Sequence, residues 1–339
     1  MLANQFVLSG RQIQDAVSEA LGRAALRPPE QAVLSKEDFS SAARSQSNHG
    51  LRQLAQKIET FYTWNDIVLP ARAMQQLHAV CATVKYRHIV FSQWGFEHKL
   101  ALGKGVNILF SGPSGTGKTM AASIVAHELE RDLYKIDLSN IVSKYIGETE
   151  KNLSRIFREA QASNAILFFD EADALFGKRS EVKDAHDRYA NIEVAYLLQK
   201  MEEYTGIVIL ATNLSKNLDD AFARRMQHTI EFPFPDAASR ERIWHAMFPK
   251  QAPLASDIDF GFLARQFELT GGNIRNIALA GALMAAEEGC QEGAVDKDKD
   301  VAICMEHLII ATARELQKLG KMPSQANFRN YYDVMRQKA

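Results

Sequence analysis

Three glycines, a lysine and a threonine lie close together in the stretch GPSGTGKT, residues 112–119. The apolar run VNILF precedes it and a helical pattern follows it. Glycines allow successive backbone N–H groups to turn toward a phosphate, and the positive end of the following helix attracts the same anion. In such a Walker A pattern, Lys118 contacts the β- and γ-phosphates and the hydroxyl of Thr119 ligates Mg²⁺. The stretch therefore predicts a site for Mg-ATP, with an ordinary turn as the alternative. The residues expected to surround the phosphates are Gly112, Pro113, Ser114, Gly115, Thr116, Gly117, Lys118, Thr119 and Met120.

Two further polar groups follow apolar runs. Asp170 and Glu171 come directly after AILFF, and Asn213 comes after ILAT. Loops at the carboxyl ends of parallel strands are where ligands bind. Asp170 therefore suits the coordination shell of Mg²⁺, Glu171 suits the role of general base toward the attacking water, and Asn213 is expected to hold that water. Polar residues that merely end a strand are the alternative.

The elements that must position these residues are indicated by the periodicity of the middle of the chain. Short apolar runs alternate with helical patterns, and the runs are VNILF, DLYKID, AILFFDE, GIVILATN and HTIEF. Runs that are apolar on both faces and separated by helices indicate a parallel sheet covered on both sides. The expected fold class is therefore α/β.

The chain changes character before and after this region. Strand patterns stop after the turn-rich FPFPDAASR, and helical periodicity continues to about residue 319. The polar stretch 289–300 interrupts it and is expected to form a loop. We expect a helical N-terminal segment at 1–60, an α/β core at 61–235 and an all-helical domain at 236–339.

The composition is that of an ordinary globular protein, with 46% hydrophobic and 24% charged residues. A formal net charge of −1 lacks the basic excess typical of nucleic-acid-binding proteins, so a nucleic-acid partner is disfavoured. No basic segment followed by a long apolar run opens the sequence, and no apolar stretch is long enough to span a membrane, so the cytoplasm is the default location. Cys81, Cys290 and Cys304 match no disulfide or metal spacing and are expected to be small apolar residues.

Two distant segments resemble each other. They are FVLSGRQIQDAVSEALGRAA from Phe6 and FELTGGNIRNIALAGALMAA from Phe267, 261 positions apart (267 minus 6). Each opens with a helix-capping signature, SxxQ from Ser9 and TxxN from Thr270. We infer that the first segment is the tail of an upstream copy of the helical domain. Two unrelated amphipathic helices with similar caps are the alternative.

Taken in order, these motifs resemble those of AAA ATPases, within the AAA+ superfamily. The resemblance runs from about Trp64 to about Gly320 and includes the Walker A stretch, the Walker B segment FFDEAD, the sensor Asn213 and LDDAFARRMQHTIEFPFPD. It implies a P-loop sheet followed by a helical lid, ATP hydrolysis with Mg²⁺, and a homo-oligomeric, hexameric ring. The chain is also similar to the C-terminal module of bacterial AAA proteins associated with contractile injection systems.

The resemblance assigns Arg224 and Arg225 as candidates for the arginine finger that enters the nucleotide site of a neighbouring subunit. The family usually has Arg-Pro-Gly-Arg-Phe here, whereas this chain has Arg-Arg-Met, similar to the microtubule-severing subgroup. Either arginine is therefore a candidate, with a solvated helix end as the alternative.

The stretch SKYIGETEKNL resembles the first pore loop of the family. By this likeness the loop would face a central channel and grip an extended polypeptide, whereas inward packing of its Tyr and Ile is the alternative. Its residues are Lys144, Tyr145, Ile146 and Gly147. The charged segment FGKRSEVKDAHDRYA resembles the second pore loop, although a charge run by itself indicates a solvated face.

Two more segments match family positions. TGGNIRN lies where the second sensor is found, which makes Gly272 and Arg275 candidates for nucleotide contact, with a surface arginine as the alternative. WNDIV resembles the segment that lines the adenine pocket, so Asp66 and Ile67 are candidates for contact with the base.

The resemblance implies a ring ATPase that remodels or threads protein substrates. The alternative is a nucleotide-gated assembly or scaffold protein, in which ATP binding switches a complex without processive threading.

Overall fold

A computed structural model describes residues 9–28, 33–47, 51, 54–96, 99, 105–137, 148–172, 185–213, 224–291 and 302–338. The chain divides into two compact units, each with its own hydrophobic core. Unit 1 comprises residues 1–63, 72–111 and 118–231, and unit 2 comprises residues 64–71, 112–117 and 232–339. The glycines of the Walker A stretch therefore group with the helical C-terminal region, whereas Lys118 and the helix that it begins belong to unit 1.

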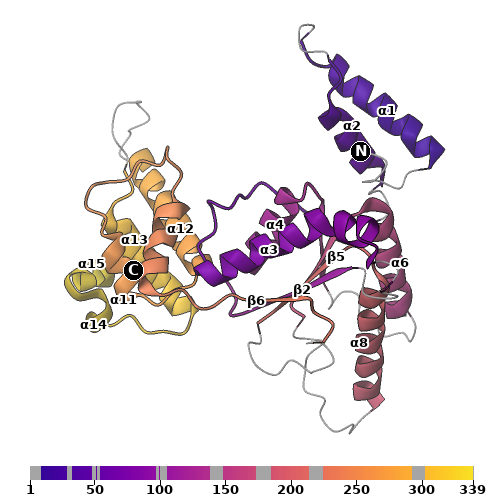
Figure 1. Cartoon of the computed structure of the whole chain (residues 1–339). Coiled ribbons are helices and arrows are strands. Elements are labelled where there is room, and N and C mark those ends of the chain that lie inside the picture. Colours follow the sequence, from indigo (N-terminus) through magenta and orange to yellow (C-terminus); the bar gives the residue numbers. More distant parts are fainter. Residues whose placement is uncertain are drawn as a thin grey trace. The chain divides into compact units, whose positions relative to one another are not determined.

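A six-stranded sheet forms the centre of unit 1, in the order β1-β3-β4-β5-β2-β6 (Figure 1). The strands are β1 (Gln56–Ile58), β2 (Val106–Ser111), β3 (Leu133–Asp137), β4 (Ile166–Asp170), β5 (Ile207–Thr212) and β6 (His228–Glu231). All neighbours pair in parallel except β1, which pairs antiparallel with β3. The five predicted strands are all present, and the predicted α/β class is confirmed.

Helices cover both faces of this sheet. The helices described in the first 231 residues are α1 (Gly10–Ala25) and α2 (Lys36–Ser47), which pack on each other, and α3 (Ala71–His88), the π-helical turn η4 (Ile89–Gln93), α4 (Lys118–Glu128), α6 (Glu148–Ser163) and α8 (Ala185–Glu203). The neighbours α6 and α8 pack side chains such as Phe157 and Met201 against Leu109, Leu167 and Leu210 of the strands (Figure 1). Because strand side chains alternate between faces, the intervening apolar residues point to the opposite side. There α4 contacts β3, β4 and β5.

Unit 2 is helical, as its periodicity predicts. Its helices are α10 (Ala237–Met247), α11 (Phe260–Gln266), α12 (Gly271–Gln291), α13 (Met305–Lys318), α14 (Gln325–Phe328), the 3-10 turn η6 (Arg329–Tyr331) and α15 (Tyr332–Lys338). Asp236 caps α10 by accepting a hydrogen bond from the Ser239 N–H, 2.8 Å long, which satisfies a donor left open at the helix start. Trp244, Phe267 and Phe328 are fully buried at the centre of the unit.

One strand corrects the sequence prediction. The polar stretch around residues 35–59 has a helical pattern, but α2 ends at Ser47 and residues 56–58 form β1 at the edge of the sheet. Three residues are too few for a period-2 pattern to be recognised. The strand exists because β3 offers an open edge for pairing, which is a tertiary effect.

The remaining general predictions concern cysteines and membranes. Cys81 is buried and unoxidised, and burial raises the pKa of its thiol to about 11, which makes it an inert packing residue. Cys304 is also a free thiol. Among the helices that the structure describes, none has the length and apolar character of a membrane span.

Candidate functional site

The predicted site residues of unit 1 leave the same edge of the sheet. Ser111, at the end of β2, pairs in register with Thr212 at the end of β5. On the other side of β5, Leu210 pairs with Phe169, which precedes Asp170. Since β2, β5 and β4 are neighbours with aligned carboxyl ends, Asn213, Asp170 and Glu171 all follow strands at one level.

Lys118 and Asn213 meet at this edge. The Lys118 Nζ donates a hydrogen bond of 3.0 Å to the Asn213 Oδ1. Lys118 is only 7% exposed, and a buried ammonium requires polar or anionic partners. The structure therefore brings together two residues that are 95 positions apart in the sequence, one predicted to hold phosphate and the other to act as sensor.

Asp170 has a cationic neighbour that sequence reasoning missed. The Lys135 Nζ, from the middle of β3, lies 2.6 Å from the Asp170 Oδ2. Lys135 lies between the apolar residues Tyr134 and Ile136 in the middle of β3, and a lysine in such a position is a signal that can mark a paired charge. Lys135 thus holds the carboxylate of Asp170 at the strand end.

Glu171 sits at a bend of the backbone. Its φ of 53° lies in the left-handed region, which costs a non-glycine residue about 1 kcal/mol. Its N–H donates to the Asp170 Oδ1 at 3.0 Å, and the next N–H, of Ala172, returns to pair with the Ala211 carbonyl at 2.9 Å. The bend leaves the Glu171 side chain exposed beyond the strand end, where a general base would be accessible to water.

The residues present suit Mg²⁺ in the way that P-loop proteins hold it. The described residues contain no cluster of three or more His, Cys, Asp or Glu that would form an all-protein metal cage. Mg²⁺ with a bound nucleotide needs only one or two protein oxygens, because phosphates and waters supply the rest. The Thr119 hydroxyl, exposed in the first turn of α4, and the Asp170 carboxylate are of the required hard-oxygen type.

The glycines of the Walker A stretch take conformations that other residues avoid. Gly112 has φ 146°, and a Cβ there would lie 2.1 Å from the Phe232 carbonyl oxygen. Gly115 has φ 76°, and a Cβ there would lie 2.5 Å from the Thr270 Oγ1. The Gly115 carbonyl accepts a hydrogen bond of 2.9 Å from the Gly272 N–H. Within unit 2, the loop is therefore packed directly against the start of α12.

Hydrogen bonds of its own cap and to α13 hold the start of α12 in place. Thr270 and Asn273 form a reciprocal cap, with the Thr270 N–H 3.1 Å from the Asn273 Oδ1 and the Asn273 N–H 3.4 Å from the Thr270 Oγ1. The Asn273 and Asn276 side-chain amides donate to the Glu315 Oε1 of α13, at 2.9 and 3.2 Å. Burial by itself would raise the pKa of Glu315, but hydrogen bonds from Asn273, Asn276 and Lys318 outweigh it and hold that pKa below its usual range.

Of the two adenine-pocket candidates, Ile67 is the one that packs against the loop. It is buried, and its Cδ1 lies 3.7 Å from where a Cβ of Gly117 would be. Asp66 is exposed. The structure thus brings Ile67, the glycine loop and Gly272 together in unit 2.

The two arginine-finger candidates differ in their surroundings. The Arg225 Nε contacts the Glu202 Oε1 of α8 at 2.5 Å, and the Arg225 carbonyl accepts a 3.4 Å hydrogen bond from the Asn107 side chain. Arg224 is exposed. The sequence treats the two arginines alike, and only the tertiary contact with Glu202 distinguishes them.

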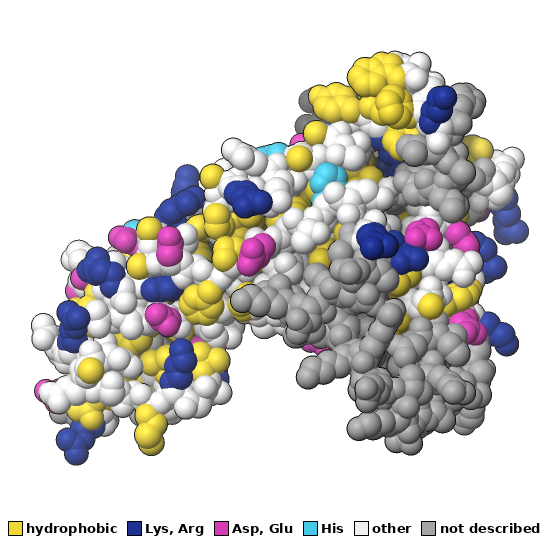
Figure 2. All heavy atoms as spheres, turned by 60° about the horizontal axis from the view of Figure 1, so that its bottom comes forward, with side chains coloured by type: hydrophobic (Ala, Val, Ile, Leu, Met, Phe, Trp, Pro, Cys, Tyr) yellow, Lys and Arg dark blue, Asp and Glu magenta, His cyan; other side chains and the backbone are white. Residues whose placement is uncertain are grey.

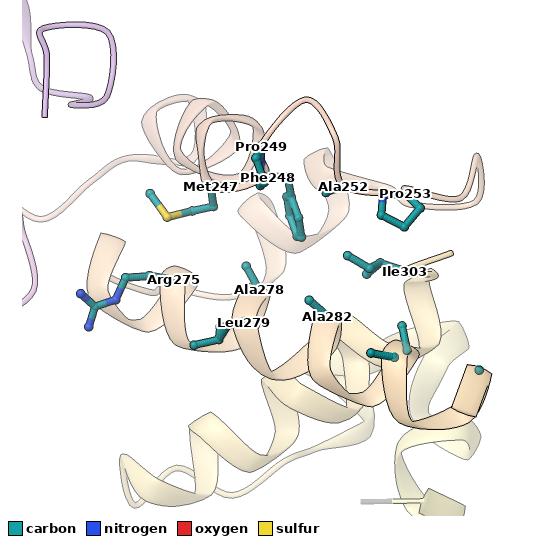
Figure 3. A pocket seen from close by; sticks show the side chains of 13 residues that line it. Met247, Phe248, Pro249, Ala252, Pro253, Arg275, Ala278, Leu279, Ala282 and Ile303 are labelled. Carbon is teal, nitrogen blue, oxygen red and sulfur yellow. The ribbon is translucent and has the colours of Figure 1, made fainter. Parts of the chain in front are cut away.

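Arg275, the second-sensor candidate, lies on the exposed side of α12 at one end of a cavity of about 640 Å³. Figure 3 shows its guanidinium directed away from the Phe248 ring.

The four pore-loop residues Lys144–Gly147 lie outside the described residues, as does most of the charged segment at 176–190. On the face drawn in Figure 2, Lys and Arg side chains stand among Asp and Glu, and the described residues there form no continuous basic tract.

A comparison of the sequence with known protein families gives a match for the middle of the chain. Residues 108–234 match the family model described as "ATPase family associated with various cellular activities (AAA)". This segment is therefore similar to the AAA family of ATPases. It contains the Walker A stretch, Asp170, Glu171, Asn213 and both arginines.

Several known proteins are similar to longer parts of the chain. A protein of Sinorhizobium fredii, named as an uncharacterized AAA family ATPase y4kL, is 33% identical over 202 residues, covering 60% of this chain and 59% of the relative. A cell division cycle protein 48 homolog of Archaeoglobus fulgidus is 29% identical over 77% of this chain and 35% of its own length. A protein of Plasmodium falciparum named as a cell division cycle ATPase is 30% identical over 74% of this chain and 20% of its own length. The chain thus spans less than two thirds of each of these relatives.

Proposed function

We propose that the chain hydrolyses Mg-ATP. One observation carries the proposal: the Lys118 ammonium lies 3.0 Å from the Asn213 amide oxygen at the strand edge from which Asp170 and Glu171 also emerge. A P-loop lysine, two acidic groups and a polar sensor are the side chains that phosphoryl transfer to water requires. The position of these side chains at one edge of the sheet supports the proposal.

Each residue has a role that follows from its chemistry. Lys118 neutralises the β- and γ-phosphates, and the glycine loop directs N–H groups toward them. Thr119 and Asp170 would hold Mg²⁺, which supplies charge neutralisation at the phosphates when bound. Glu171 accepts a proton from the attacking water, and Asn213 orients that water. Ile67, packed against Gly117, offers an apolar surface for the base.

The test is the variant Glu171→Gln. It keeps the size and backbone bend of the residue but removes the basic carboxylate, so ATP binding should stay within about 2-fold while the hydrolysis rate falls by about 100-fold or more. The matched control is Glu130→Gln, because Glu130 is also exposed and has a left-handed φ of 51° but follows α4 rather than a site strand. Hydrolysis by Glu171→Gln at the rate of the natural chain would refute the proposed base.

We further propose that the working form is a homo-oligomeric ring, hexameric by its family likeness, that remodels or threads a protein substrate through a channel lined by Lys144–Gly147. The exposed Arg224 is available to a neighbouring subunit, which supports a composite site. If so, the ATPase rate per subunit rises with protein concentration, because arginine fingers act only in assemblies. A rate that is independent of concentration would argue for isolated subunits.

The second candidate function is a nucleotide-gated scaffold. The variant Tyr145→Ala separates the two candidates, since threading needs an aromatic grip and switching does not. Under threading, basal ATPase persists and remodelling of a protein substrate is lost, whereas under switching Tyr145→Ala changes neither.

Likeness to bacterial AAA proteins of contractile injection systems makes a contractile, phage-tail-like assembly our proposed partner and the cytoplasm our proposed location. Co-purification with sheath components would test that assignment.

A further inference from the structure

The helix pairs α1–α2 and α12–α13 share the same caps. The Ser9 N–H lies 2.9 Å from the Gln12 Oε1 and the Gln12 N–H 3.4 Å from the Ser9 Oγ, which is the same reciprocal cap that Thr270 and Asn273 form at α12. The second helices also begin alike. The Ser35 N–H donates to Asp38 at 2.8 Å, and the Cys304 N–H donates to His307 at 3.1 Å. In each pair, therefore, both helices begin with the same arrangement of bonds.

The two pairs also bury the same positions. Ala16, Ala20 and Ala24 face α2, and the residues 261 positions later, Ile277, Gly281 and Ala285, are buried on α12. Phe39 of α2 packs on Ala16 and Ala20. In the second pair Leu308 takes this place, since its Cδ2 lies 2.8 Å from where a Cβ of Gly281 would be.

A side-chain contact that includes one carboxylate joins the two helices of each pair. Arg27 contacts Asp38, and Glu288 contacts His307, with 2.9 Å between the Glu288 Oε2 and the His307 Nε2. Arg27 and Glu288 are again 261 positions apart (288 minus 27), and Asp38 and His307 are both nearly buried. Asp38 of α2 supplies the carboxylate in one pair and Glu288 of α12 supplies it in the other, so the contact is kept although the residues differ. The hairpins are thus two versions of one structural unit, which supports the repeat over two unrelated helices.

The hairpins differ in what covers them. Ile274 and Ala278 of α12 are buried and lie in the same hydrophobic cluster as Ile243 and Trp244 of α10, the helix that packs on α12. Figure 3 shows Met247 and Phe248, at the end of α10, opposite Ala278 and Ala282.

The residues of α1 that match Ile274, Ala278 and Ala282 form a larger, exposed apolar stripe. Ile13, Val17 and Leu21 are 50%, 39% and 50% exposed, at a four-residue spacing that places them on one side of the helix. Three large aliphatic side chains exposed in a row beside the buried alanines of α1 favour a covering surface.

We propose that Ile13, Val17 and Leu21 form a docking face for a helix pair of the α10–α11 type, supplied by a second lid-like module. The occupant is specified by the interface that this chain already contains, in which α10, itself packed on α11, packs against α12 in the cluster that buries Ile274 and Ala278. The archaeal relative, of which the matched part is only 35%, shows that relatives carry sequence beyond the region that this chain matches. The proposal is independent of the catalytic roles given above.

The test supplies the proposed occupant. A second copy of residues 236–266 is joined ahead of Phe6, so that its connection to α1 reproduces that between Gln266 and Phe267, and amide hydrogen exchange is followed in residues 10–25. Protection should rise about 10-fold or more over the natural chain, and Ile13→Asp in the fused chain should abolish the gain. Ser18→Asp should keep it, because the equivalent Leu279 is 61% exposed even in the covered hairpin. Unchanged exchange in the fused chain would overturn the proposal.

A second comparison does not depend on the fusion. In the natural chain, Ile13→Asp should shift the melting temperature by less than about 2 °C and lower the binding of an apolar dye, whereas Ile274→Asp should lower the melting temperature by more than about 5 °C. If Ile13→Asp destabilises the chain as Ile274→Asp does, the face is already covered. If α1 becomes protected as protein concentration rises, a second copy is its occupant. Either result refutes the proposal.

Discussion

The residues predicted to bind nucleotide are of different kinds in units 1 and 2. Unit 1 contains charged and polar side chains at the carboxyl edge of the sheet, namely Asp170 and Asn213 at strand ends and Lys118 at the start of α4. Unit 2 contributes backbone and close packing, in which the glycine loop touches the start of α12. A charge at a strand end can be removed without disturbing the fold, whereas a side chain added to a packed loop displaces its neighbours. Substitutions at these side chains of unit 1 should therefore change ATP binding or hydrolysis with little effect on stability, whereas substitutions in the packed loop of unit 2 should disturb its neighbours as well.

The largest effect is expected for Lys118→Ala. Removal of the ammonium takes away a charge-assisted contact with phosphate, so ATP affinity should fall by about 100-fold or more with little change in stability. Calorimetric titration with ATP and a thermal melt measure the two quantities. Lys200→Ala is the control, because Lys200 pairs with Glu203 on α8 and has no role at the strand edge. Equal ATP affinities of Lys118→Ala and the natural chain would contradict the proposed role of Lys118 in phosphate binding.

The two arginines sharpen the comparison within unit 1. Arg224→Ala should lower the ATPase rate of the assembled protein by about 10-fold or more while leaving stability unchanged, because Arg224 is exposed. Arg225→Ala should lower the unfolding free energy, because the contact with Glu202 and the packing at α8 are lost. Steady-state kinetics at high protein concentration and urea unfolding distinguish these outcomes. The opposite pattern would make Arg225 the finger.

Gly115→Ala tests the packing of unit 2. The added methyl group would lie 2.5 Å from the Thr270 Oγ1, so Thr270 must move and the start of α12 with it. We expect ATP affinity to fall by about 10-fold. Gly320→Ala is a close control, since Gly320 has φ 71° but no atom within 4 Å of its Cβ position. Both variants carry the backbone cost of about 1 kcal/mol, and only Gly115→Ala should weaken ATP binding. Equal ATP affinity of the two variants would mean that this close approach has no part in binding.

The smallest effect is expected for Glu315→Gln. A folded-state pKa below the usual value means that the ionised carboxylate stabilises unit 2 at neutral pH and that this stabilisation declines as pH falls below the ordinary Glu range. Glu315→Gln keeps an oxygen for Asn273 and Asn276 but cannot lose a charge. Melting temperatures between pH 7 and about 3 should therefore fall less for Glu315→Gln than for the natural chain. Parallel curves would show that the Glu315 charge does not stabilise unit 2.

The site could be predicted from the sequence where its information is local. Glycine, lysine and threonine at fixed spacing specify a phosphate loop, and apolar runs with polar ends specify strands and their carboxyl edge. Five strands, the helix that begins at Lys118 and the helical C-terminal region follow from such patterns. Caps at Ser9 and Thr270 were likewise visible, because a cap involves residues only three positions apart.

Only the tertiary structure decided which distant residues meet. The pairing of Lys135 with Asp170, of Arg225 with Glu202, and of Gly115 with Gly272 depends on strand order and helix packing, which no short pattern encodes. The edge strand β1 exists because β3 offers it open hydrogen-bonding groups. Local spacing determined which residue types could bind and hydrolyse ATP. Burial and pairing between segments far apart in the chain determined which of these residues lie together.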